Sequence, residues 1–283
     1  MSHLNLFAAP RPFAVLSAAR RDMIPIMLYE MRWLIPRRAR VAVRRTLDRH
    51  KSAAAARLAP RIFELTGGTV ASGPFEGMKY ITTAVNSEIC PKLLGTYEME
   101  LAPAIAQALD KPYDRVINIG AAEGYYAVGF ARRLPLASVA AFESAESGRA
   151  ALRQLAQRNG LGQRVEILGH CTPAALEIAM LAFERVLVIC DAEGDEAELL
   201  DPAVAGSLQN ADILVELHDG HRRGVSQMIW NRFARRGPIE VFRSRARLAA
   251  DFPAGLPLAD DEKLAAMWEN RSWRQNWYWM SKR

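Results

Sequence analysis

The chain of 283 residues has few of the features that mark membrane or secreted proteins. No apolar run approaches the ~20 residues that a membrane-spanning helix requires, and no segment has the long apolar core of a secretory signal. The three cysteines, Cys90, Cys171 and Cys190, form no Cys-x-x-Cys pair and have no histidine at metal-ligand spacing. This composition predicts a cytoplasmic protein in a reducing compartment, in which Cys171 and Cys190 pack in the core.

Acidic residues are scarce in one part of the chain only. Residues 1–61 hold 13 Lys and Arg against 3 Asp and Glu, whereas the rest of the chain holds 24 basic and 28 acidic residues. The net charge of +6 therefore comes from the N-terminal segment. We expect residues 1–60 to form a basic helical N-terminal extension, which prolines such as Pro36 and Pro60 cut into short helices. This extension either contacts an anionic membrane surface, a nucleic acid or an acidic partner, or packs as a solvated helix on its own domain or on a second copy in a homodimer.

Residues 61–110 are expected to form a small cap. Turns in its first half are marked by Gly67, Gly68, Gly73, Pro74 and Gly77. Short strand-like pieces between such turns indicate a β-hairpin, and a helix is expected at residues 102–109. The side chains of Tyr97, Glu98 and Glu100, just before this helix, either face a site as part of a lid or pack on a sheet.

Residues 114–143 read as strand, turn, helix and strand. The first apolar run ends at Gly120, a helical pattern continues from Gly124 to about Leu134, and a second apolar run closes on Glu143. In a βαβ unit of this kind, glycines let the backbone turn tightly beneath a ligand, and an acid after the second strand can accept hydrogen bonds from ribose hydroxyls. The segment therefore predicts a ligand site between Gly120 and Glu143.

Acidic and histidine side chains follow two later strands. The fourth strand, residues 186–190, is followed by Asp191 and Glu193, and the fifth ends at Glu216 and His218, with His221 beyond it. Ligands bind outside the carboxyl ends of the strands in open parallel α/β sheets, so these side chains should gather at one edge of the sheet.

Three interpretations of this group remain open. In the first, His218 is a general base, and Asp191 and Glu193 orient the molecule from which it removes a proton. In the second, Asp191, Glu193, Glu216, His218 and His221 share a divalent ion such as Mg²⁺. In the third, Glu216 pairs with an arginine and His221 caps the next helix.

Two motifs resemble those of a known family. Residues 118–124, N-I-G-A-A-E-G, resemble the first motif of the S-adenosylmethionine-dependent class I methyltransferases, an acid followed by x-Gly-x-Gly-x-Gly, with Asn118 in place of the acid and Ala122 in place of the middle glycine. Residues 191–200, D-A-E-G-D-E-A-E-L-L, followed by I-L-V-E-L-H at 213–218, resemble the FkbM-type O-methyltransferases. The resemblance covers about residues 115–218.

The resemblance implies an α/β fold with a Rossmann-like seven-stranded methyltransferase sheet, which has helices on both faces and ends in a hairpin of strands six and seven. It also implies that residues 111–283 form an S-adenosylmethionine-binding methyltransferase domain, preceded by the cap and the basic extension. Four tryptophans, Trp268, Trp273, Trp277 and Trp279, either pack in the core or join Arg271 and Arg274 in an aromatic cluster that binds a flat or sugar-like molecule.

The resemblance further implies a site for the cofactor S-adenosyl-L-methionine. Gly120, Glu123 and Gly124 would line its methionine and ribose end, Glu143 would bind its ribose, and Asp191 and Glu193 would border the transferred methyl group. His170 follows the third strand and either lies near the adenine or is an incidental loop residue. The expected cofactor contacts are Asn118, Gly120, Ala121, Glu123, Gly124, Tyr125, Glu143, His170 and Asp191. The expected catalytic residues are His218, Asp191 and Glu193, without a metal.

The function that follows from these expectations is methyl transfer to oxygen in a small molecule or a glycan. One alternative is an RNA or other nucleic-acid methyltransferase that uses the basic extension, although no Asn/Asp-Pro-Pro-Tyr/Phe tetrapeptide for base-nitrogen methylation is present. The other is a non-catalytic binding protein on the same fold, which the departures at Asn118 and Ala122 favour.

Overall fold

The computed structural model describes residues 37–271 and 275–282. The chain divides into two compact units, Met1–Arg49 and His50–Arg283. The fold of the second unit is described below. Helix α2 (Arg37–Leu65) continues through Pro60, so the expected break at that proline is wrong. Ala55 and Ile62 are buried on either side of Pro60 and anchor the helix in the core. The other prolines of the extension lie outside the described residues.

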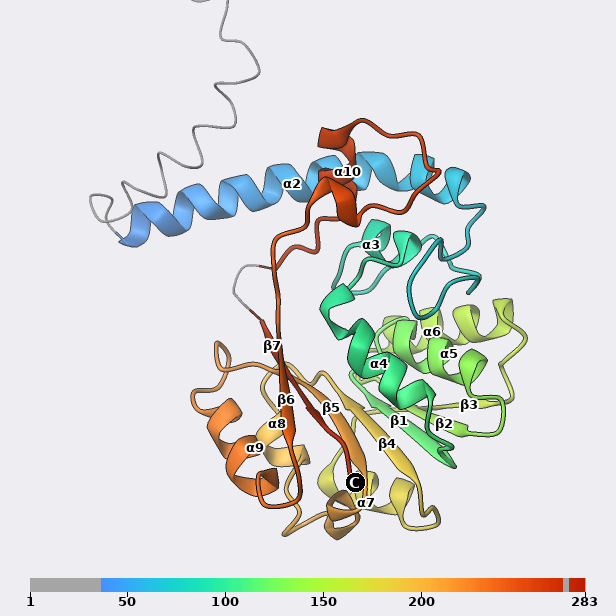
Figure 1. The fold of residues 1–283 in the computed structure, drawn as a ribbon, viewed down its shortest axis with the longest axis vertical. Helices are drawn as coiled ribbons and strands as arrows, with labels where there is room; N and C mark the ends of the chain where they lie inside the picture. Colours follow the sequence, from blue (N-terminus) through green and yellow to red (C-terminus); the bar gives the residue numbers. More distant parts are fainter. Residues whose placement is uncertain (1–36, 272–274, 283) are drawn as a thin grey trace, which may run out of the picture. The chain divides into compact units, whose positions relative to one another are not determined.

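A single seven-stranded sheet forms the centre of the second unit (Figure 1). Its strands are β1 (Arg115–Ile119), β2 (Ser138–Phe142), β3 (Val165–Leu168), β4 (Val186–Cys190), β5 (Asp212–Leu217), β6 (Ile239–Arg243) and β7 (Asn276–Met280). Their order in the sheet is β3-β2-β1-β4-β5-β7-β6. Strands β1 to β5 are parallel, whereas β7 runs antiparallel to both β5 and β6.

Side chains of the central strands alternate between two buried faces, as their near-continuous apolar sequences require. In β1, for example, Val116 contributes to one hydrophobic cluster and Ile117 to the other. Helices α4 (Ala102–Leu109), α5 (Tyr125–Arg133) and α6 (Glu146–Arg158) cover the first face. Helices α7 (Pro173–Met180), α8 (Glu196–Leu199) and α9 (Val225–Phe233) cover the second.

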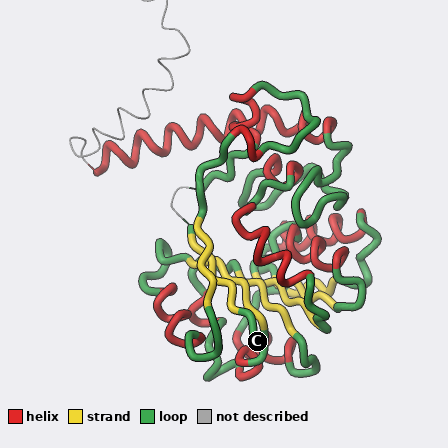
Figure 2. Tube along the Cα trace, viewed as in Figure 1, coloured by secondary structure: helices red, strands yellow, loops and turns green. Residues whose placement is uncertain are grey.

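This arrangement confirms the expected Rossmann-like sheet with helices on both faces, in which the last two strands pair with each other. Figure 2 shows the strands as one twisted layer between the helices. Trp277 and Trp279 of β7 are both buried in the first cluster, as expected for core residues, while Trp273 and Arg274 lie outside the described residues. None of the described helices is long and apolar enough to cross a membrane.

The cap differs from its prediction. Instead of a β-hairpin, residues 66–88 form successive turns joined by one isolated bridge between Thr69 and Lys79. The physical reason is that Gly67, Gly68, Gly73 and Gly77 all adopt positive φ angles, which repeatedly reverse the chain before a ladder can extend. Helix α3 (Ile89–Leu94) follows these turns, and helix α10 (Asp260–Ala266) lies in the long connection between β6 and β7.

Candidate active site

A cavity of about 450 Å³ opens at the carboxyl ends of β1, β2, β4 and β5. Its volume lies within the range of small-molecule sites, roughly 300–1,000 Å³. The wall combines the turn after β1, the residues after β2 and β4, the end of β5, the cap and the segment before β7. The expected residues that line it are Asn118, Gly120, Ala121, Tyr125, Glu143, His170, Asp191, Glu193 and His218.

The turn after β1 depends on backbone conformations that favour glycine. Gly120 has a φ of 72°, and a Cβ placed on it would lie 1.7 Å from the carbonyl oxygen of Asp191. Ala122, which stands where the family motif has glycine, has a φ of 48°. An alanine in this left-handed region is strained by about 1–2 kcal/mol. The chain thus retains the shape of the glycine turn at the cost of strain at Ala122.

Asn118 and Glu143 present polar groups to the cavity beside this turn. Asn118 is 2% exposed, and its Oδ1 accepts no hydrogen bond from any described residue. The Glu143 carboxylate is oriented by two backbone N–H groups, of Ala122 and Ala145, each 2.8 Å from one of its oxygens. Each of these oxygens has a second lone pair, so Glu143 can still accept hydrogen bonds from a ligand.

Two of the expected cofactor contacts lie outside the cavity wall. Glu123 is fully buried and points into the cap, where it pairs with Lys92 and accepts hydrogen bonds from the Tyr80 hydroxyl (2.7 Å) and the Val85 N–H (3.0 Å). Gly124 caps α5 with a φ of 98°, and its Cβ position is blocked by Leu152. Glu123 therefore links the turn after β1 to the cap through these three contacts.

The acids after β4 lie at different depths. The Oδ1 atom of Asp191 is buried and accepts no hydrogen bond from the described residues, while the Glu193 side chain is largely exposed at the rim. Burial, followed by the charges of Glu98 and Glu193, raises the pKa of Asp191 to about 8. Both acids face the cavity, as predicted.

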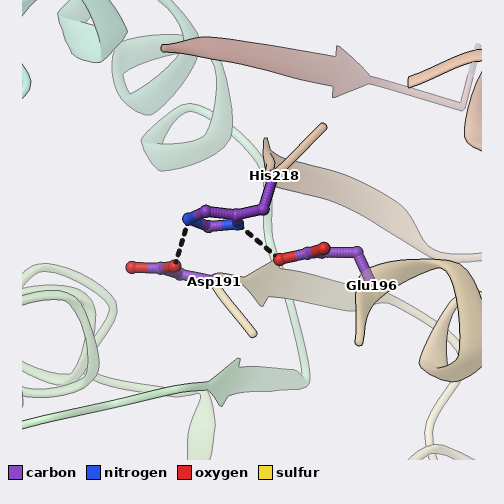
Figure 3. A group of neighbouring side chains, drawn as sticks. All are labelled: Asp191, Glu196 and His218. Atoms are coloured by element: carbon purple, nitrogen blue, oxygen red, sulfur yellow. Dashed lines mark hydrogen bonds and ion pairs between the residues drawn. The ribbon is translucent and has the colours of Figure 1, made fainter. Parts of the chain in front are cut away.

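His218 is held between carboxylates that follow β4 (Figure 3). Its Nδ1 lies 2.6 Å from Oε1 of Glu196, and its Nε2 lies 3.6 Å from Oδ1 of Asp191 on the opposite side of the ring. Burial alone lowers the pKa of His218, but the hydrogen bond to Glu196 and the charges of Glu216, Glu196 and Glu193 raise it overall. A hydrogen bond to Glu196 places the proton on Nδ1 of the neutral ring, which leaves Nε2 free to accept one.

Glu196 contacts His218 and was not among the residues expected at the site. It is fully buried, and its Oε1 also accepts hydrogen bonds from the N–H groups of Ala192 and Gly194, both at 3.1 Å. The signal was present in the D-A-E-G-D-E motif, where Glu196 opens α8. Its position after the strand does not by itself show that its side chain turns back toward β5.

A second missed feature is the set of ion pairs around Arg271. Its guanidinium contacts three carboxylates, of Glu216 (2.8 Å), Glu269 (2.9 Å) and Glu98. Glu216 therefore pairs with an arginine, as the third interpretation predicted. His221 does not cap α9: its ring stacks on that of His218 at 5.3 Å between centroids, and its Nδ1 lies 2.9 Å from the Glu193 carbonyl oxygen.

Residues of the cap complete this wall. The Tyr97 ring lines the cavity and lies 5.6 Å from the Arg271 guanidinium. Glu98 is buried against Arg271 and the Tyr126 hydroxyl, while Glu100 binds Arg247. Of these three cap residues, Tyr97 faces the cavity, whereas Glu98 and Glu100 form ion pairs that stabilise the surrounding structure.

Asp191, Glu196 and His218 also have potential metal-ligand atoms within 4.8 Å of one another. The two carboxylates, however, face opposite nitrogens of the imidazole (Figure 3). An ion on Nε2 would lie toward Asp191, whereas Glu196 would hold the ring from behind, as carboxylates do for metal-bound histidines. The geometry therefore suits a proton on Nδ1 of His218, and it allows either a proton or a metal ion at Nε2.

Comparisons with known proteins give matches among solved structures only. No protein-family model and no curated protein match the chain. An O-methyltransferase from Bacillus cereus in complex with SAH is 14% identical and has a TM-score of 0.41, with 62% of this chain and 78% of that chain covered.

Two further structures show the same level of similarity. The O-methyltransferase TomG from Streptomyces achromogenes in complex with SAM is 16% identical, with a TM-score of 0.41 and coverage of 62% and 77%. A precorrin-8w decarboxylase from Methanobacterium thermoautotrophicum is 15% identical, with a TM-score of 0.42 and coverage of 63% and 88%. Because the identities and TM-scores of these structures are low, the fold is defined by the strand order of this chain and not by any of the similar structures.

Proposed function

We propose that the protein is an S-adenosylmethionine-dependent methyltransferase of the FkbM type that acts on oxygen in a small molecule or a glycan. The observation that carries the proposal is the convergence of the Gly120 turn, Glu143, Asp191 and His218 on one cavity. These residues come from four different strand ends, and the sheet order brings them to the carboxyl edge where α/β folds bind ligands.

The cavity offers the groups that such a cofactor needs. The turn at Gly120 lets the backbone approach closely, the buried Oδ1 of Asn118 lacks a donor, and Glu143 can accept from ribose hydroxyls. When bound, the cofactor would supply a methyl group on a sulfonium; the acceptor oxygen would bond to this methyl carbon in line with the carbon–sulfur bond that breaks, and S-adenosylhomocysteine would leave as a neutral thioether. Holding the two reactants in this geometry accounts for much of the acceleration in such a reaction.

The residues opposite the turn would activate the acceptor. Nε2 of His218 accepts the hydroxyl proton as the oxygen–carbon bond forms, and Glu196 stabilises the resulting imidazolium through Nδ1. Asp191 and Glu193 border the same space and orient the acceptor. The base must be neutral before the reaction, so transfer should increase with pH through the raised pKa of His218.

Binding of S-adenosylhomocysteine, measured by isothermal titration, tests this proposal. We expect binding by the folded protein and clear weakening in Glu143→Ala, because that variant removes the carboxylate held over the turn. Glu166→Ala, an exposed acid on β3 outside the cavity, is the matched control. Absence of binding at millimolar ligand would refute the proposal, and would leave the non-catalytic binding protein as the better interpretation.

The basic extension keeps an RNA methyltransferase as a second candidate, since residues 1–61 hold 13 Lys and Arg against 3 Asp and Glu. Removal of residues 1–49 is the appropriate deletion, because Ala55 and Ile62 of the following segment are buried in the core. RNA binding that disappears in this deletion, measured by filter retention, would favour the RNA candidate. Vesicles with anionic lipid and sedimentation of the full chain test the proposed membrane contact and homodimer.

A further inference from the structure

The described wall of the cavity contains more acidic than basic side chains. Its carboxylates belong to Glu143, Asp191, Glu193, Asp195, Glu216 and Glu269. Its permanently charged basic side chains are Lys92 and Arg271. A ligand that enters this space therefore meets a surplus of negative charge.

Both of these cations are already neutralised by other side chains. Lys92 pairs with Glu123, which lies outside the wall. Arg271 contacts Glu98, Glu216 and Glu269 at once, three carboxylates for one guanidinium. Within residues 37–271 and 275–282, neither basic side chain of the wall is left to attract an anionic ligand.

The surplus is concentrated around Nε2 of His218. One oxygen each of Asp191, Glu193 and Glu216 lies at 3.6, 3.7 and 3.8 Å from this nitrogen. These distances are too long for hydrogen bonds. Glu216 is 6% exposed and meets Arg271 through Oε1 only, and the buried Oδ1 of Asp191 has no donor in the described part of the chain.

Catalysis would increase this excess of negative over positive charge. His218 must be neutral to accept a proton, so the imidazole within 4 Å of all three acids contributes no charge in the reactive state. The imidazole of His221 lies 3.2 Å from Glu193, at the rim. Burial and mutual repulsion raise the pKa of Asp191 and of Glu216, which is the expected response of carboxylates that lack a counter-charge. A positively charged ligand group would remove that cost.

On this basis we infer that the acceptor carries a protonated amine close to the hydroxyl that receives the methyl group, and that Asp191, Glu193 and Glu216 bind this amine. An amino alcohol or amino sugar has this chemistry. The inference predicts that an acceptor bearing a phosphate or a carboxylate at this position is not methylated, because the juxtaposition of like charges costs several kcal/mol. The inference rests on the proposed function, whose sulfonium cofactor supplies one positive charge and leaves the rest of the surplus to the acceptor.

The decisive experiment separates acceptors by charge. An extract that contains small molecules and glycans is divided at pH 7 into cation-exchange-retained, anion-exchange-retained and neutral fractions, and each is incubated with the full chain and methyl-labelled S-adenosylmethionine. We expect label in the cation-retained fraction, and we expect prior N-acetylation of that fraction to abolish it. Label confined to the neutral or anionic fraction would overturn the inference while leaving the transferase intact.

Binding of S-adenosylhomocysteine, measured in parallel, separates the two levels of the argument. Protein that does not bind it fails the proposed function itself. Protein that binds it but labels no fraction refutes both the transferase and the cationic acceptor. Each assay is repeated with a chelator: transfer lost in chelator and restored by Mg²⁺ would assign the three acids to a divalent ion and overturn the inference.

A matched pair of variants tests the acids directly. Glu193→Gln removes a rim charge, and we expect KM for the cation-retained acceptor to rise about two- to fivefold, in keeping with an exposed charge pair, with S-adenosylhomocysteine affinity unchanged. Glu198→Gln removes an exposed charge from the same segment outside the cavity and should leave KM unchanged. Equal KM values in the two variants would contradict the inference.

Discussion

The buried pair of Lys92 and Glu123 gives the sharpest prediction about stability. Lys92 is 3% exposed and Glu123 is fully buried, and the carboxylate also accepts hydrogen bonds from Tyr80 and from the backbone of Val85. Glu123→Gln leaves the ammonium in the interior without its counter-charge. Removing one partner of a buried ion pair costs about 3–5 kcal/mol. For a domain of this size, about 2–4 °C of Tm is lost per kcal/mol, so we expect Tm to fall by roughly 6–20 °C.

Thermal unfolding followed by circular dichroism measures this effect. Asp260→Asn is the control, because Asp260 forms an exposed ion pair with Lys263 at 2.8 Å and such pairs contribute about 0–1 kcal/mol. The double variant Lys92→Met/Glu123→Gln should recover part of the loss, since it removes the unpaired charge as well. A Glu123→Gln protein as stable as the Asp260→Asn protein would refute the conclusion that Glu123 stabilises the cap.

The same pair predicts how stability responds to acid. Burial alone raises the pKa of Glu123, but the charge of Lys92 and the hydrogen bonds from Lys92, Tyr80 and Val85 lower it overall. A lowered folded-state pKa gives stability that is present above the unfolded value, about 4.3, and is lost as pH falls through the folded value. Urea unfolding between pH 3 and pH 6 should therefore show a steeper loss for the parent than for Glu123→Gln.

Three further predictions concern the site. Gly120→Ala places a Cβ 1.7 Å from the Asp191 carbonyl oxygen, so we expect S-adenosylhomocysteine binding, measured by titration, to be lost; retained affinity would show that the turn adapts. Ala122→Gly relieves a φ of 48° and should raise stability in urea by about 0.5–1 kcal/mol, part of the gain being offset by the freer unfolded chain; a loss of stability would contradict strain at Ala122. Glu196→Gln removes a charge that raises the pKa of His218, so the rising limb of the pH–rate profile should move to lower pH, and an unchanged limb would argue against His218 as the base.

The regular elements followed from the sequence to within a few residues. The strand expected at residues 186–190 has those bounds in the structure, because a continuous apolar run between polar turns has few alternatives. The prediction of a hairpin in the cap was wrong for a local reason. Its glycines have positive φ values, and the sequence does not show whether a glycine adopts a turn conformation or an extended one. The predicted helix break at Pro60 was wrong because the burial of Ala55 and Ile62, which stabilises the continuous helix, is a tertiary effect.

The site followed from the sequence in part. Residues that end strands, such as Asp191 and His218, could be placed because parallel strands bring their carboxyl ends to one edge. The direction of a side chain in a turn could not be placed: Glu123 turns into the cap and Glu196 turns toward His218. Arg271 lies 55 residues beyond Glu216, and no local pattern connects the two.

The position of β7 between β5 and β6 has a consequence for synthesis. Strand β6 pairs only with β7 among the described strands, and residues 244–275 separate the two. A ribosome therefore releases β6 well before the strand that joins it to the sheet, and its edge, with the exposed Val241, must wait unpaired. Arg271, whose ion pairs join the wall of the cavity, lies in the connection between β6 and β7, so the same segment that completes the sheet also completes the acidic cavity.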